Sequence, residues 1–288
     1  MDPASLETLA QTIRRYSLVS IHAAKSGHPG GVLSCADILA VLYGNELGAQ
    51  DAPESERNRF IMSKGHACPA LYAAWAATDL LDPKELTTLR HLDGRLEGHP
   101  DVISTPLAET STGSLGQGMS VACGMALGAR HQGWTSRIYA LLGDGELQEG
   151  EIWEALMFAA HHKLSNLCAI IDYNKLQSDD FNANIMGLEP LADKLAAFGW
   201  NVLEIDGHDF AAITGAFDTF RAETEKPTVI VAHTAKGQGV SFMAGKPNWH
   251  GSILLTAEDL GRSLVDLGIA ESDTAEWING SIFERIAQ

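Results

Sequence analysis

The chain has 288 residues, of which 45% are hydrophobic and 20% are charged, a globular composition that allows a sizeable core. Its formal net charge of −17 argues against nucleic acid or an anionic membrane surface as a partner. We expect neither a signal peptide nor a membrane span, because no apolar run is long enough. The four cysteines, at positions 35, 68, 123 and 168, have no metal-type spacing. Reduced, buried thiols and a cytoplasmic location are expected.

The first 90 residues are predicted to be mainly helical. Apolar spacing and breaker residues predict helices over 4–22, 35–47, 67–80 and 83–90, and a short strand over 60–62. Ser34 with Asp37 resembles a capping pair at the start of the second helix. Asp82 followed by Pro83 is typical of the start of the last one.

The middle of the chain changes character twice. Residues 91–112 show no period and contain several Gly and Pro residues, and long irregular stretches in compact domains are often functional. A glycine-rich helix is predicted over 113–129, with Gly124 and Gly128 on one face. Because glycine inside a helix costs about 1 kcal/mol relative to alanine, we expect a strand or a ligand to approach that face closely.

From residue 137 onwards strand and helix patterns alternate. The predicted strands are 137–142, 167–172, 200–205 and 227–233, and the predicted helices are 150–162, 189–198 and 209–222. This rhythm is typical of an α/β fold, an open and mostly parallel sheet with helices on both faces. We predict a single domain over 1–288, with an N-terminal helical and loop extension. A helical tail, with helices over about 256–267 and 273–286, is expected from about residue 251.

The most informative stretch is Gly143-Asp-Gly-Glu-Leu-Gln-Glu-Gly150, which lies between a predicted strand and a predicted helix. Glycines there let backbone N–H groups approach a phosphate, and a helix N-terminus favours an anion. Asn174 follows Asp144 by 30 residues, about one helix and one strand, so neighbouring parallel strands would place them side by side. Carboxylate, amide and carbonyl oxygens suit Mg²⁺ or Ca²⁺. The alternative is a tight turn with an ordinary Asn at a strand end.

Four histidines lie next to Gly or Pro in predicted loops, and histidine is the side chain that transfers protons near neutral pH. They are His28, His66, His99 and His250. A single loop histidine is more often an ordinary surface residue without a function, but four histidines near predicted strand ends favour a functional cluster. Lys236 precedes a Gly turn and is either another site residue or a solvated lysine.

These motifs together resemble a known family. Gly-Asp-Gly followed about 30 residues later by Asn resembles the thiamine-diphosphate motif, and the surrounding sequence resembles the N-terminal domain of transketolase. The matching stretches are Ser26-Gly-His-Pro-Gly30, Ser63-Lys-Gly-His66, Gly98-His-Pro100, Thr112-Gly-Ser-Leu-Gly-Gln-Gly118, Gly143 to Gly150, Glu151-Ile-Trp-Glu-Ala155, Phe198-Gly-Trp200, Asp206-Gly-His-Asp209, Lys236-Gly-Gln-Gly239 and Trp249-His-Gly251. One departure lies at Gln177-Ser-Asp-Asp180, where the family usually has Gly in the last position.

The resemblance implies thiamine diphosphate as cofactor, which supplies carbanion chemistry at its thiazolium C2 carbon, together with Mg²⁺, Ca²⁺ or Mn²⁺. By resemblance, Asp144, Asn174 and the Leu176 carbonyl hold the metal. The residues implied to bind the cofactor are His66, Gly113, Ser114, Leu115, Gly143, Asp144, Gly145, Glu146, Glu149, Asn174 and His250. Those implied to act in catalysis are His28, His66, His99, His250 and Lys236. Glu149 and Glu154 match acids at the family's dimer interface.

The resemblance also implies a partner. In the family, the glutamate that binds the cofactor's pyrimidine ring and the residues that bind the substrate phosphate lie in a second domain. We expect the partner to be a C-terminal transketolase subunit, the assembly to be an α2β2 tetramer, and the reaction to be ketol transfer between sugar phosphates. An apolar interface patch is expected within 113–125 and 149–156. Two alternatives stay open: a split enzyme with a branched or sulfonated sugar donor, and a non-catalytic scaffold paralogue.

Overall fold

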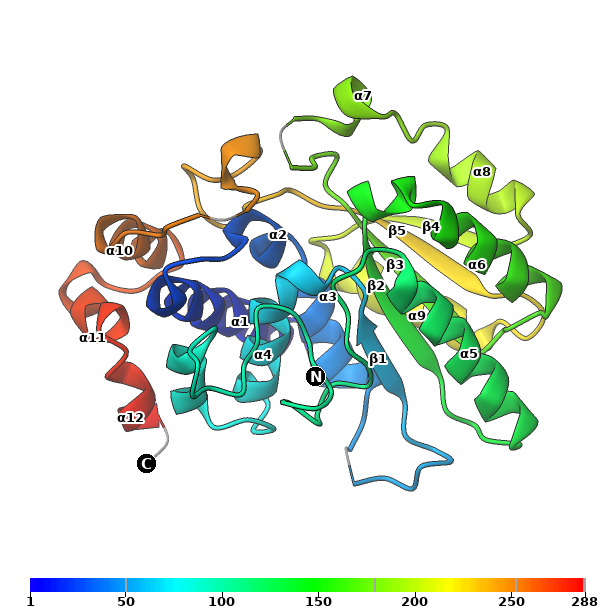
Figure 1. Ribbon diagram of the computed structural model, residues 1–288, viewed down its shortest axis with the longest axis horizontal. Coiled ribbons are helices and arrows are strands. Elements are labelled where there is room, and N and C mark those ends of the chain that lie inside the picture. Colours follow the sequence, from blue (N-terminus) through cyan, green and yellow to red (C-terminus); the bar gives the residue numbers. More distant parts are fainter. Residues whose placement is uncertain (50, 179, 252, 287–288) are drawn as a thin grey trace.

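The computed structural model describes residues 1–49, 51–178, 180–251 and 253–286. Within these ranges lies one five-stranded, wholly parallel sheet with the strand order β1-β2-β3-β5-β4. The strands are β1 (Arg59–Met62), β2 (Ile138–Gly143), β3 (Leu167–Tyr173), β4 (Asn201–Asp206) and β5 (Thr228–His233). The predicted α/β fold with a parallel sheet is confirmed (Figure 1).

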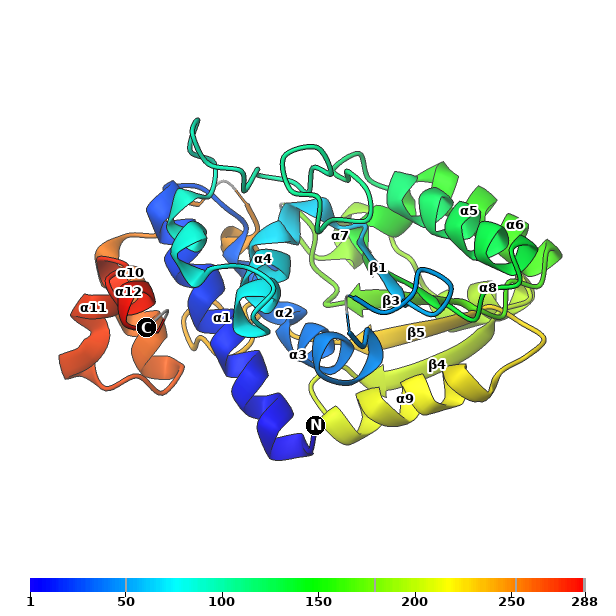
Figure 2. The same cartoon turned by 90° about the horizontal axis from the view of Figure 1, so that it is seen from below.

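Helices cover both faces of the sheet, so its central strands are buried on both sides, as parallel strands usually are. The sheet separates two hydrophobic cores, and the side chains of β2 point alternately into them. Ile138 and Leu142 face one core, and Tyr139 and Leu141 face the other. Figure 2 shows α5 and α6 on one side of the sheet and α9 on the other. The first core contains α5 (Gln117–His131), α6 (Gly150–His161) and α8 (Leu191–Ala197); the second contains α1 (Pro3–Ala24), α3 (Ala36–Val41), α4 (Cys68–Ala77) and α9 (Phe210–Ala222).

The helix predicted over 35–47 is divided, and the predicted capping pair is wrong. Ser34 is the last residue of α2 (Pro29–Ser34), and its hydroxyl donates to Asp172 at the end of β3. Asp37 pairs instead with Arg14. After α3 the chain continues as a π-helical turn over Leu42–Glu46. Both side chains of the presumed cap therefore serve tertiary contacts.

The glycine-rich helix α5 begins at Gln117 rather than at residue 113. Gly113 and Gly116 precede it with φ of 144° and 92°, a region that favours glycine. The expected close approach at Gly124 and Gly128 is wrong within this chain, since a Cβ at either would meet nothing within 4 Å. The reason is that α5 faces the sheet with its buried side, which includes Ala122 and Ala126, so both glycines lie on the outer side.

The C-terminal helices pack onto the start of the chain. They are α10 (Ala257–Asp266), α11 (Thr274–Ile278) and α12 (Ile282–Ile286), so the single helix predicted over 273–286 is two. Tyr16 of α1 joins them, with ring centroids 6.1 Å from Trp277 and 5.0 Å from Phe283. Residues 252, 287 and 288 of the predicted tail lie outside the described residues.

The remaining helical segments are short. They are the 3₁₀ turns at Gly65–Ala67, Pro83–Thr88, Gly145–Gln148, Pro247–Trp249 and Glu271–Asp273, and α7 (Asn182–Ile185). The Asp82 side chain caps its turn, as predicted, by accepting from the Lys84 N–H at 3.0 Å. All four cysteines are free and buried, as expected. None of the helices described is both long and apolar enough to span a bilayer.

Candidate active site

The two predicted metal-ligand side chains follow neighbouring strands. Gly143 at the end of β2 is in register with Asp172 near the end of β3, so Asp144 and Asn174 leave the sheet at the same edge. The Asp144 carboxylate accepts from the Lys175 N–H at 2.5 Å and from the Gly145 N–H at 2.8 Å. The carboxylate therefore ties the two strand ends together, as the sequence spacing predicts.

A cavity of about 360 Å³ opens at this edge, where ligands bind in parallel α/β sheets. The predicted site residues that line it are His28, His66, His99, Gly113, Leu115, Gly143, Asp144, Gly145, Glu146, Asn174, Leu176, Lys236 and His250. Two predicted cofactor contacts, Ser114 and Glu149, are exposed and do not line it. Elements far apart in the sequence are thus collected around one cavity.

Three of the four loop histidines form a cluster. The ring of His28 lies 5.1 Å from that of His66 and 5.7 Å from that of His250, and the last two are 5.6 Å apart. Burial, and then nearby cations, lower the pKa of His28 to about 4 and that of His250 to about 3. Burial likewise holds the pKa of His66 well below its usual range and lowers that of His99. All four rings are therefore neutral at pH 7.

Lys236 places a positive charge beside this cluster. Its ammonium is buried and donates to the Leu176 carbonyl at 3.0 Å and to Nδ1 of His250 at 2.5 Å. Because Nδ1 accepts, the hydrogen of the neutral His250 ring is on Nε2. Burial lowers the pKa of Lys236 to about 8, so the amine is mostly protonated at pH 7.

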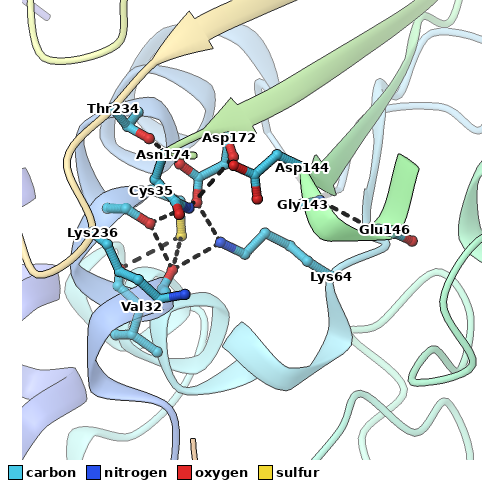
Figure 3. A network of polar contacts seen from close by, with 12 residues as sticks. Val32, Cys35, Lys64, Gly143, Asp144, Glu146, Asp172, Asn174, Thr234 and Lys236 are labelled. Carbon is cyan, nitrogen blue, oxygen red and sulfur yellow. Dashed lines mark hydrogen bonds and ion pairs between the residues drawn. The ribbon is translucent and has the colours of Figure 1, made fainter. Parts of the chain in front are cut away.

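A buried ion pair beneath the cavity was missed by the sequence reasoning. Lys64 pairs with Asp172, and both side chains are at most 1% exposed (Figure 3). The hydroxyls of Ser34 and Thr234 also donate to Asp172, and Lys64 donates to the Gly31 carbonyl at 2.9 Å. In the sequence, this pair was indicated only by the positions of its two residues, Lys64 in the motif 63–66 and Asp172 in the polar stretch 172–176.

The charges of this pair support each other. Burial alone would raise the pKa of Asp172, but the Lys64 charge and three hydrogen bonds outweigh it and lower that pKa. Burial would likewise lower the pKa of Lys64, but the Asp172 carboxylate raises it above its usual range. The pair is therefore ionised and locks together the ends of α2, β1, β3 and β5.

The two acids of the glycine turn have different surroundings. Glu146 accepts from the N–H groups of Gly116 at 2.9 Å and Gly143 at 3.0 Å and from the Ser63 hydroxyl. It therefore holds the turn against the start of α5, although burial raises its pKa. Burial, followed by the charge of Asp172, raises the pKa of Asp144 to about 6. Both effects disfavour the charged carboxylate, and a bound cation would stabilise it.

The residues present fit a hard divalent cation held together with a ligand. Among the described residues, no three His, Cys, Asp or Glu side chains gather to hold a metal ion by themselves. Asp144, Asn174 and the Leu176 carbonyl supply oxygen only, so the other positions would need oxygens from a ligand, such as phosphates. The buried Nδ1 of His28 also has no partner within the described parts of the chain.

Several curated proteins are similar to this chain in sequence. The chain is 41% identical over 259 residues to the transketolase of Pongo abelii, covering 88% of this chain and 41% of that protein. It is 40% identical over 252 residues to an apulose-4-phosphate transketolase subunit of Phocaeicola vulgatus, covering 87% and 89% of the two chains. It is 42% identical over 255 residues to a 6-deoxy-6-sulfo-D-fructose transketolase subunit of Clostridium sp. (strain MSTE9), covering 88% and 92%.

The fold is shared with solved transketolases as well. The Leishmania mexicana enzyme superposes with a TM-score of 0.87 at 30% identity, covering 98% of this chain and 45% of that one. The chain thus spans about two fifths of the length of the full transketolases that it matches. Residues 5–276 match the family described as "Transketolase, thiamine diphosphate binding domain". The chain therefore belongs to the family of the transketolase thiamine diphosphate binding domain.

Proposed function

We propose that this chain is the diphosphate-binding subunit of a two-chain transketolase. It would transfer a two-carbon ketol unit from a ketose donor to an aldose phosphate, using thiamine diphosphate and Mg²⁺. The observation that carries this proposal is the cavity in which Asp144, Asn174 and Leu176 offer oxygens beside four neutral histidines. When bound, thiamine diphosphate supplies a carbon that can store the electrons of the broken C–C bond.

Each group of residues has a task that follows from its geometry. Asp144, the Asn174 amide and the Leu176 carbonyl would hold the metal, which would supply positive charge for the diphosphate. Lys236 and the Nε2–H of His250 would donate to the diphosphate oxygens, since both are donors that line the cavity and contact each other. The Gly145 N–H and His66 would contact the cofactor as well in this proposal.

Proton transfer to the sugar would fall to the other histidines. A neutral imidazole can accept a proton at one nitrogen and donate from the other. His28 has a buried Nδ1 with no partner in the described chain, and His99 is an exposed residue that lines the cavity. We propose that these two rings exchange protons with the donor and acceptor hydroxyls, and that closure by a partner excludes water.

The partner we propose is a C-terminal transketolase subunit in an α2β2 assembly, in a cytoplasmic enzyme. Two relatives are named as transketolase subunits, and this chain covers 89% and 92% of their lengths.

The expectation of an apolar interface patch needs correction, since the ranges 113–125 and 149–156 contain no large exposed hydrophobic side chain. Leu115 lines the cavity, and Val121, Met125 and Trp153 are partly buried against the core, whereas Met157 and Phe158 of α6 are 55% and 39% exposed. Glu149, at the start of α6, and Glu154, within it, are also exposed.

The donor sugar has two candidate classes. The two relatives named as subunits are named for an apulose phosphate and for a sulfonated fructose, so a branched or sulfonated donor is as well supported as an ordinary ketose phosphate. The scaffold alternative is disfavoured because the carboxylate, the amide and all four histidines are present and gathered in the cavity.

The test is to purify the chain with its native partner, identify the partner by mass spectrometry, and assay the pair. The assay offers thiamine diphosphate, Mg²⁺ and a panel of ordinary, branched and sulfonated ketose donors. We expect ketol transfer with the pair and none with the chain alone. Transfer by the chain alone, with no partner detectable, would refute the two-chain proposal. No transfer from any donor by a pair that binds the cofactor would favour the scaffold.

A further inference from the structure

The motif Asp206-Gly-His-Asp209 lies outside the cavity but against its wall. Asp206, at the end of β4, is in register with His233 at the end of β5, and its side chain accepts from the His208 N–H at 2.9 Å. A Cβ at Gly207 would lie 2.5 Å from Thr234 Cγ2, so only glycine lets this turn approach β5. Asp209 caps α9 by accepting from the Ala211 N–H at 2.8 Å. The motif therefore fixes His208 next to the segment that follows β5.

His208 joins a buried carboxylate to that segment. Its Nδ1 lies 2.7 Å from Asp37 Oδ2, and its Nε2 lies 2.8 Å from the N–H of Ala235. A backbone N–H can only donate, so Nε2 accepts and Nδ1 carries the hydrogen that is donated to Asp37. The two contacts together determine both the tautomer and the orientation of the ring.

The carboxylate of Asp37 is itself held on the far side. Arg14 of α1 donates to the same oxygen at 2.6 Å, and the side chains of Arg14 and Asp37 are 4% and 5% exposed. Burial would raise the pKa of Asp37, but the hydrogen bond from His208 and the Arg14 charge outweigh it and lower that pKa. Asp37 is therefore a fixed, charged acceptor that orients His208.

The anchored segment carries the cavity's lysine. Ala235 directly precedes Lys236, whose ammonium reaches Leu176 and His250. On either side the chain is held by backbone partners: the Thr234 N–H donates to Tyr173 and the Gly237 N–H to Gly30. Ala235 is anchored by a side chain instead, so a change at residue 208 can release it without altering the sheet.

We propose that His208 is a positioning residue for Lys236, acting through the Ala235 N–H. His208 does not line the cavity; it fixes where the Lys236 backbone begins and hence where the ammonium lies. A function for the lysine toward diphosphate rests on the proposed function, but the positioning itself does not.

Two variants of His208 test the two hydrogen bonds of its ring one at a time. In His208→Asn the amide nitrogen replaces Nδ1 and can still donate to Asp37, but the side chain is too short to reach Ala235. In His208→Gln the amide oxygen replaces Nε2 and can still accept from Ala235. His233→Asn is the matched control, because His233 ends the neighbouring strand but is 40% exposed and bonds to the exposed Glu204 at 3.1 Å.

The first measurement is amide hydrogen exchange of the segment 234–240, which needs no cofactor. We expect His208→Asn to speed exchange at Ala235 by about tenfold, which corresponds to the loss of one hydrogen bond, and to lower the free energy of unfolding by no more than that loss. His208→Gln should restore most of the protection, and His233→Asn should match the wild type. Equal exchange at Ala235 in His208→Asn and the wild type would overturn the proposal, whatever the Gln variant does.

The second measurement is calorimetric titration of the purified chain, or its complex, with thiamine diphosphate and Mg²⁺. We expect about tenfold weaker binding in His208→Asn, recovered in His208→Gln. If the wild-type complex with its partner binds no cofactor, the proposed function fails while the exchange experiment still decides the positioning. If exchange changes but cofactor affinity does not, Lys236 does not contact the diphosphate, and the link to the cofactor is overturned.

Discussion

Breaking the buried Lys64–Asp172 pair should be the most destabilising single polar change in this part of the fold. Lys64→Met leaves the Asp172 carboxylate with only the Ser34 and Thr234 hydroxyls as donors among the described residues. Asp172→Asn leaves the buried ammonium hydrogen-bonded to neutral oxygens only, the Gly31 carbonyl and the new amide oxygen. Removing one partner of a buried pair typically costs about 3–5 kcal/mol. Both side chains are at most 1% exposed, so solvent screening does not reduce that figure, and we expect each variant to lose about 3–4 kcal/mol.

The double variant Lys64→Met/Asp172→Asn distinguishes the pair from general damage to the core. With both charges gone, neither is left uncompensated, so the double variant should lose less than either single one. The assay is urea unfolding followed by tryptophan fluorescence, with Glu85→Gln as control. Glu85 pairs with Arg95 at 2.5 Å, but their side chains are 30% and 43% exposed, so the control should cost about 0–1 kcal/mol. Single-variant losses that add within about 0.5 kcal/mol, or that stay near the control, would refute the reasoning.

The same pair predicts the pH dependence of its contribution. The pKa of Asp172 is lowered on folding, so its stabilisation is present above the unfolded value of about 3.9 and is lost as pH falls through the folded pKa. The pKa of Lys64 is raised, so its stabilisation is present below about 10.4 and is lost as pH rises through the folded pKa. The titration of the pair itself should add no slope to the stability difference between wild type and double variant between roughly pH 4 and 10. A small slope near pH 6 is expected from Asp144, because the Asp172 charge helps to raise its pKa to about 6. Loss of most of the difference inside that window would contradict an ionised pair.

Three further predictions concern the site and its helix. Asp144→Ala should abolish Mg²⁺-dependent binding of thiamine diphosphate in calorimetry, and unchanged affinity would contradict the metal assignment. His99→Ala should lower kcat/KM of the assembled enzyme by about 10²-fold with cofactor affinity unchanged; equal losses in both would indicate a diphosphate contact. Gly118→Ala should cost about 1–3 kcal/mol, because its Cβ would lie 2.4 Å from Ser63 Oγ. Gly124→Ala, on the same helix with open space, should stabilise the chain by about 0.5–1 kcal/mol, and equal effects would refute the packing.

The sheet and the metal-ligand candidates were predictable because their signals are local. Apolar runs of strand length alternate with helical periods, and a short crossover between parallel strands places Asp144 and Asn174 at one edge. Glycine turns mark where each strand ends. The histidine cluster was predictable in part, since Gly and Pro place each ring in a loop, and loops at one edge of the sheet meet.

The contacts that lock the site were not predictable, because they join residues distant in the sequence. Lys64 meets Asp172 across 108 positions and His208 meets Asp37 across 171, and no periodicity encodes such pairs. The start of α5 was misplaced for the same reason: the Gly116 N–H is held by the Glu146 carboxylate, so the helix begins only at Gln117. Ser34 and Asp37 have the composition of a cap, yet both side chains are used by distant partners.

The distribution of charge explains how an acidic chain can receive an anionic ligand. The net charge of −17 repels a diphosphate at long range, so attraction has to be local. At the cavity, Lys64 is neutralised by Asp172, and the histidines are neutral. Lys236 has no carboxylate within ion-pair distance in the described parts of the chain, and its pKa of about 8 keeps it mostly charged at pH 7. Its ammonium and a cation on Asp144 would therefore attract a diphosphate at the cavity, with Arg90 close enough for its charge to lower the pKa of His28 and His99. Removing the ammonium or the cation should weaken binding more than any change on the acidic surface.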